Sequence, residues 1–131
     1  MRTQTHSLYL SAPKDRVFAF LSEIENLPEW AVNFCQKLEK VADGGYCVIT
    51  PQGQIHFRVE SDAATGVIDM YGGPKPDMMA YWPARVVEWP GLGSLFLFTM
   101  AQLPGMSDEE FTAQSEALKA EFEHIREIVE V

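Results

Sequence analysis

The sequence has few positive charges, and this shortage limits the partners that the protein can have. Ten Lys and Arg residues stand against nineteen Asp and Glu residues, so the formal net charge is −9. Because an acidic surface repels phosphate groups, nucleic acids and anionic membranes are unfavourable partners. Much of the acid lies near the C-terminus and at Glu23, Glu25 and Glu29, where a solvent-exposed face is its simplest role.

Long hydrophobic runs are also missing. No apolar run approaches the roughly 20 residues that a membrane-spanning helix requires. The N-terminal segment MRTQTHSLYL lacks the charged region and apolar core of a secretory signal. From these two absences we expect a cytoplasmic protein that does not insert into a membrane.

Cysteine is scarce, since only Cys35 and Cys47 occur. A hairpin that turns at Asp43-Gly44 would place Cys47 opposite Lys40, which keeps the two thiols several residues apart along the ladder. That separation is too large for a disulfide. We therefore expect two free thiols that behave as small buried hydrophobic side chains.

Motifs for metal binding, phosphate binding and catalysis do not stand out. His6 and His124 have no ligand partner at metal spacing, so we expect neither a zinc site nor a cofactor. The Gly-Pro segment 72–76 predicts a flexible turn. We interpret this segment as a loop at the mouth of a cavity and not as an anion cradle.

The clearest positive signal is a long amphipathic helix over residues 107–131. Ser107 is a good N-cap, and Glu110 completes a capping box with it. Met106 and Phe111 fit a hydrophobic staple across the same helix start. One apolar face recurs at helical spacing, formed by Phe111, Leu118, Phe122, Ile125 and Val129.

The rest of the chain predicts one strand, two short helices and then a series of strands. Residues 3–10 form the first strand, a helix opens at Pro13, and Pro28 starts a second short helix that carries Trp30 and Phe34. Alternating apolar residues then predict strands at 35–42, 45–50, 54–60, 66–71, 79–89 and 93–101. Pro83 predicts a bulge or a break, because proline cannot donate to a ladder.

Several of these segments resemble a known superfamily. The pattern SAPKDRVFAFLSEIENLPEW at 11–30 is similar to the helix and Trp segment of the SRPBCC superfamily, the START-like helix-grip proteins that include polyketide cyclases and dehydrases. PARVV at 83–87, GSLFLFT at 93–99 and PGMSDEEF at 104–111 resemble a bacterial group within it. The resemblance spans essentially the whole chain. It implies a deep apolar cavity between the sheet and the C-terminal helix, but it transfers no catalytic residue.

The predicted fold class is α+β, with one helix-grip domain over residues 1–131. A curved antiparallel sheet of about seven strands wraps the long C-terminal helix, two short helices follow the first strand, and the first strand lies beside the seventh. The helix is narrower than the sheet, so a gap is expected between them. Core packing is the alternative for each side chain that we expect to line this gap and bind a ligand: Trp30, Phe34, Tyr81, Phe96, Phe98, Met100, Phe111 and Leu118.

Polar candidates depend on which way their strands face. Asp69 enters the cavity if Val67 and Tyr71 face inward, and it is a surface carboxylate if Ile68 and Met70 face inward. An inward Asp69 would need a partner, and Arg85 is the nearest candidate. His56 is expected on the polar side of its strand.

The sequence therefore predicts binding of a small hydrophobic ligand, such as a lipid, a polyketide or an aromatic compound. The first alternative is a cyclase- or dehydrase-like enzyme in which Asp69, Tyr81, Arg85 or His56 moves protons on that ligand. The second is a protein-interaction module whose groove holds an apolar segment of a partner. A homodimer is left open.

Overall fold

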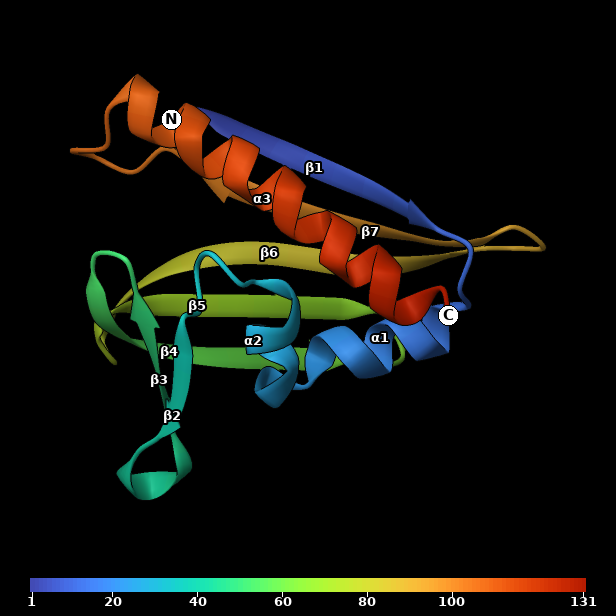
Figure 1. Cartoon of the computed structure of the whole chain (residues 1–131), viewed down its shortest axis with the longest axis horizontal. Coiled ribbons are helices and arrows are strands. Elements are labelled where there is room, and N and C mark those ends of the chain that lie inside the picture. Colours follow the sequence, from blue (N-terminus) through green and yellow to red (C-terminus); the bar gives the residue numbers. More distant parts are fainter.

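A seven-stranded antiparallel sheet forms the body of the computed structural model, which describes all residues from 1 to 131 (Figure 1). The strands run in the order β1-β7-β6-β5-β4-β3-β2. This is the expected meander, with β1 paired to β7. The strand bounds are β1 (Thr3–Leu10), β2 (Lys37–Lys40), β3 (Tyr46–Thr50), β4 (Gly53–Asp62), β5 (Val67–Lys75), β6 (Met78–Trp89) and β7 (Gly93–Ala101).

Three helices lie against the sheet. The long helix α3 crosses it, with α1 beside its C-terminal end and α2 beside its middle (Figure 1). Short 3-10 turns precede α2 and join β2 to β3. The helical bounds are α1 (Lys14–Ser22), η1 (Ile24–Asn26), α2 (Leu27–Trp30), η2 (Ala42–Gly44) and α3 (Asp108–Val129).

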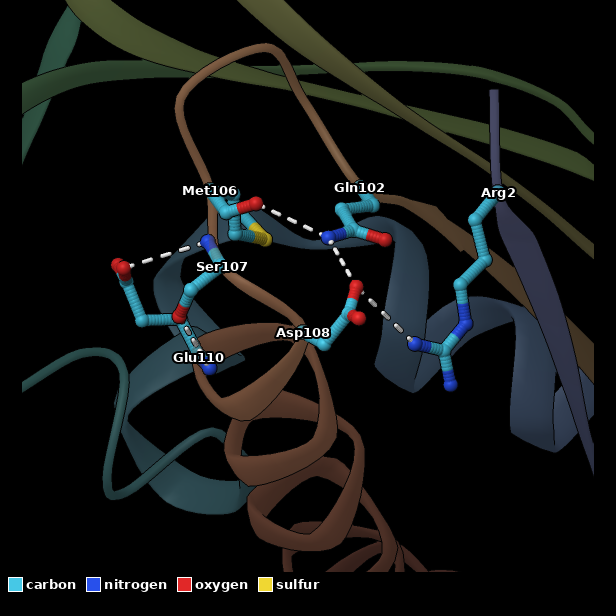
Figure 2. Close-up of polar contacts among 6 residues, drawn as sticks. All are labelled: Arg2, Gln102, Met106, Ser107, Asp108 and Glu110. Carbon is cyan, nitrogen blue, oxygen red and sulfur yellow. Dashed lines mark hydrogen bonds and ion pairs between the residues drawn. The ribbon is translucent and has the colours of Figure 1, made fainter.

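The start of α3 carries the capping box that the sequence predicts. Figure 2 shows the backbone N–H of Glu110 donating to Ser107 Oγ at 3.0 Å, and the backbone N–H of Ser107 donating to Glu110 Oε1 at 3.3 Å. Gln102 adds a bridge, because its amide donates to the Met106 carbonyl and to Asp108 Oδ1, each at 2.9 Å. The two capping-box bonds satisfy backbone N–H groups that a helix end otherwise leaves unpaired, and they fix where α3 begins.

The apolar face of α3 packs on the sheet as expected. Its five predicted members are all buried, and Phe111 and Ile125 have no exposed surface. Phe122 lies at the centre of an aromatic group, with its ring centroid 5.4 Å from that of Phe96 and 6.2 Å from that of Phe98. This face is the main contact that holds the helix against β1 and β7.

The β2–β3 connection differs from the predicted two-residue hairpin. The turn at η2 is longer, with Asp43 in the left-handed region at φ 68° and the Val41 N–H bonded to the Gly45 carbonyl. The register consequently shifts by one residue, and Cys47 faces Glu39 instead of Lys40. The expectation for the thiols is nevertheless confirmed, since Cys35 and Cys47 are both free and buried.

One further sequence prediction was wrong in detail. Segment 72–76 is no loop, because β5 continues to Lys75 and the turn falls at positions 76 and 77. Gly72 is needed within that strand, since a Cβ atom there would lie 3.0 Å from Phe57 and 3.1 Å from Trp82. Pro83 interrupts a ladder as expected, because the pairing of β6 with β7 ends next to it, at Ala84, while β6 itself continues through its pairing with β5.

Candidate functional site

A cavity of about 470 Å³ opens between α3, the turn after α2 and the concave face of the sheet. Thirteen of its nineteen lining residues are hydrophobic, so its walls are largely apolar. This apolar set comprises Leu27, Trp30, Ala31, Phe34, Ile55, Phe57, Met70, Trp82, Phe98, Met100, Ala113, Ala117 and Leu118. The volume lies in the range of about 300–1,000 Å³ that suits one small molecule.

The cavity has a solvent-exposed rim. Asn33, Pro51, Gln52, Ala113 and Gln114 line it and are also exposed to solvent. They come from three elements: the turn after α2, the β3–β4 turn and the first half of α3. We therefore take this edge as the entrance.

An aromatic group forms the wall at one side. Phe34, Phe57 and Trp82 contact one another, with ring centroids 5.7 Å apart for Phe34 and Phe57 and 6.0 Å apart for Phe34 and Trp82. Phe57 and Trp82 come from the sheet, whereas Phe34 lies just beyond the end of α2. The sequence had predicted that Phe34 lies within that helix. Because Phe34 is the only one of the three outside the sheet, the turn after α2 closes this wall.

Five of the eight predicted lining residues lie in the cavity wall, namely Trp30, Phe34, Phe98, Met100 and Leu118. Phe96 and Phe111 do not line it, because both are completely buried in the packed core. Tyr81 does not line it either, since 46% of its surface is exposed. That any of the five contacts a ligand stays a prediction.

Tyr81 and Asp69 lie together on the opposite face of the sheet. Ile68 and Met70 are both buried, so Asp69 between them faces outward. The Tyr81 hydroxyl donates to Asp69 Oδ1 at 2.8 Å, and this hydrogen bond raises the pKa of Tyr81 to about 12. The Tyr81 ring also stacks on Tyr71, with centroids 5.0 Å apart. The two side chains are thus partners on the outer surface.

Arg85 and His56 are likewise outside the cavity. Arg85 is exposed, and its Nε donates to the Thr65 carbonyl at 3.0 Å. The pairing of Arg85 with Asp69 that the sequence had suggested is therefore not formed. His56 lies opposite Cys47 across β3 and β4, with Nδ1 3.8 Å from the thiol sulfur. The four candidates for proton transfer therefore do not converge on the cavity.

Glu121 is the ionisable side chain in the cavity wall, and it was not among the residues predicted from the sequence. Its side chain is only 4% exposed, and its Oε2 accepts the backbone N–H groups of Asn33 and Phe34, each at 3.1 Å. Burial raises the pKa of Glu121, while the two N–H donors act in the opposite direction. The signal in the sequence was a glutamate next to Leu118 and Phe122 on the face of α3 that packs inward.

A second buried polar group lies between β1 and α3. His6 Nε2 is 3.0 Å from the Ser115 hydroxyl, and that hydroxyl donates to Gln4 Oε1 at 3.4 Å. Burial, assisted by Lys119, lowers the pKa of His6. None of these side chains lines the cavity, so the group joins the helix to the sheet edge.

Solved structures of other proteins share this architecture. XoxI from Bacillus cereus superposes with a TM-score of 0.76 at 15% identity, and the match covers 98% of this chain and 96% of XoxI. The Aha1 dimer from Colwellia psychrerythraea superposes with a TM-score of 0.72 at 13% identity, and the match covers 100% of this chain and 98% of the Aha1 chain. The chain has the helix-grip fold. That assignment confirms the fold class expected from the sequence.

A third helix-grip structure is the di-domain ARO/CYC BexL from the BE-7585A biosynthetic pathway. It matches with a TM-score of 0.76 at 18% identity over 99% of this chain, which spans 47% of BexL. No protein-family model matches the sequence, and no curated protein matches it. At such low identities the likeness defines the fold and leaves the function open.

Two other features of the molecule bear on its partners. None of the helices combines the length and the apolar character that crossing a membrane requires. His, Cys, Asp and Glu side chains nowhere gather in a group of three or more that could hold a metal ion.

Proposed function

We propose that the protein binds one small hydrophobic molecule in the cavity between α3 and the sheet. The observation that carries this proposal is an apolar cavity of about 470 Å³ with a solvent-exposed rim. Moving apolar area from water into such a cavity is favourable by about 25 cal/mol per Å². Phe34, Phe57 and Trp82 offer a large aromatic contact area, which suits a ring system or a lipid chain.

Binding is better supported than catalysis. An acid–base enzyme needs two titratable groups within hydrogen-bond reach of one point in its site. Glu121 is the single ionisable side chain in the cavity wall, whereas Asp69, Tyr81, Arg85 and His56 lie elsewhere. The cyclase-like alternative, which the ARO/CYC protein BexL brings to mind, therefore lacks a proton-transfer partner here.

The test uses N-phenyl-1-naphthylamine, a neutral apolar dye whose emission rises when it leaves water. We expect saturable binding of one dye per chain. Ala117→Phe places a ring in the cavity wall and should weaken binding by about tenfold or more, which corresponds to about 1.4 kcal/mol. Ala120→Phe is the matched control, because Ala120 is exposed on the same helix and does not line the cavity.

Two results would count against the proposal. The first is an absence of saturable dye binding to the wild-type protein. The second is equal dye affinity for Ala117→Phe, Ala120→Phe and wild type, which would place the dye somewhere other than the cavity. Circular dichroism of both variants checks that the fold survives.

A further inference from the structure

Glu121 combines burial with an unused hydrogen-bond acceptor. Both backbone donors that reach it, from Asn33 and Phe34, bond to the same oxygen, Oε2. Oε1 accepts no hydrogen bond from the chain, and it is not among the completely enclosed unpaired polar atoms. Since the side chain is 96% buried and lines the cavity, the surface that Oε1 retains opens toward the cavity.

The charge pattern of the cavity has one sign. No Lys, Arg or His lines it, and its other polar side chains are neutral: Asn33, Thr50, Gln52 and Gln114. Thr50 is already occupied, because its hydroxyl donates to the Gly53 carbonyl at 2.8 Å and accepts the Gln52 N–H at 3.2 Å. An anionic head group would therefore meet a carboxyl group and no cation.

We propose that the cavity selects an apolar molecule that carries one hydrogen-bond donor, an ammonium or a hydroxyl group, and that Glu121 Oε1 accepts this donor. This inference rests on the proposed function and names the ligand class for the same cavity. Buried polar groups are nearly always hydrogen-bonded, so a bound ligand that filled the cavity without a donor would leave Oε1 unpaired. A donor on the ligand removes that penalty, and hydrogen bonds to a charged acceptor are among the stronger ones.

The alternative is that Glu121 serves only the fold. Its Oε2 plainly does so, because it fastens the turn after α2 to the middle of α3. A structural role requires only that one oxygen, however, and it is indifferent to what enters the cavity. Ligand selectivity therefore separates the two roles.

The experiment compares four naphthalene compounds that have the same ring and a side chain of similar length. They are 2-(1-naphthyl)ethylamine, 2-(1-naphthyl)ethanol, 1-propylnaphthalene and 3-(1-naphthyl)propanoic acid, each measured by displacement of N-phenyl-1-naphthylamine at neutral pH. We expect the amine and the alcohol to bind more tightly than the hydrocarbon, the amine by about tenfold. The acid should bind most weakly.

The variant Glu121→Gln tests whether this carboxyl group sets the order. The glutamine carbonyl can still accept the N–H groups of Asn33 and Phe34, and its NH₂ group then faces the cavity as a donor. We expect the amine to lose its advantage over the hydrocarbon, the acid to gain affinity, and 1-propylnaphthalene to bind as before. Glu116→Gln removes the same charge from an exposed position on α3 and should leave the wild-type order unchanged.

The outcomes are separable. If the hydrocarbon binds but the amine and the alcohol bind no better, the ligand class is wrong while the binding function stands. The same conclusion follows if Glu121→Gln keeps the wild-type order. If none of the four compounds displaces a dye that does bind, the ligand class is likewise wrong. If the dye itself does not bind, the cavity is not a binding site and both proposals fail. The wild-type comparison decides the matter even if the variant does not fold.

Discussion

Replacing Phe122 by Ala should destabilise the protein strongly, because this side chain joins α3 to the sheet. The ring is 4% exposed. Its centroid lies 5.4 Å from Phe96, 6.2 Å from both Phe98 and His6, and 6.4 Å from Trp30. Truncating a buried Phe costs about 3–5 kcal/mol. With four rings around it that cannot all collapse into the space, we expect about 4 kcal/mol.

Urea denaturation measures this effect. At about 2 kcal/mol per molar urea, a loss of about 4 kcal/mol lowers the midpoint by about 2 M. Ile128→Ala on the same helix is the control, since Ile128 is 36% exposed and its truncation should change the free energy of unfolding by less than about 1 kcal/mol. Equal midpoints for wild type and Phe122→Ala would refute the claim that this face of α3 holds the helix against the sheet.

Three other predictions address the helix cap, the buried imidazole and the buried thiol. Ser107→Ala removes one half of the capping box and should lower the free energy of unfolding by about 1 kcal/mol, measured by urea titration. The pKa of His6 is lowered below 6.5 in the folded protein, so the unfolded chain takes up a proton first as the pH falls. The free energy of unfolding should therefore decrease as pH drops below 6.5. A His6→Gln variant that kept this decrease would contradict the claim that His6 causes it. Burial and the Glu121 charge raise the pKa of Cys35 to about 11, so iodoacetamide at pH 8 should leave it unmodified until urea is added, and rapid alkylation of the native protein would be the opposing result.

The parts of the fold that local sequence determines were predictable. Ser107 and Glu110 set the start of α3 through bonds three residues apart, and the same local pattern predicted the helix face. The order of the strands followed from their spacing along the chain, which favours neighbours in a meander. The register at η2 was not predictable in this way, because it depends on the left-handed conformation of Asp43.

The cavity wall was predicted only in part, because each strand has two faces. Tyr81 was predicted to line the cavity, but its neighbour Trp82 lines it instead. Arg85 could have shown which way β6 faces, because a charged side chain is expected to face solvent. Since side chains alternate along a strand, an outward Arg85 places Tyr81 outward and Trp82 inward. Glu121 was missed for a different reason. Acidic residues on α3 are numerous, and although Glu121 lies on the inward face of the helix, its two hydrogen-bond donors come from the turn after α2, whose position the sequence pattern does not give.

A crystal structure of the protein with N-phenyl-1-naphthylamine is the most direct test of the central claim. The account predicts one dye molecule inside the cavity, against Phe34, Phe98 and Leu118, with its apolar rings away from the exposed rim. A dye molecule on the outer face of the sheet beside Tyr81, or a cavity closed by its own aromatic side chains, would contradict it.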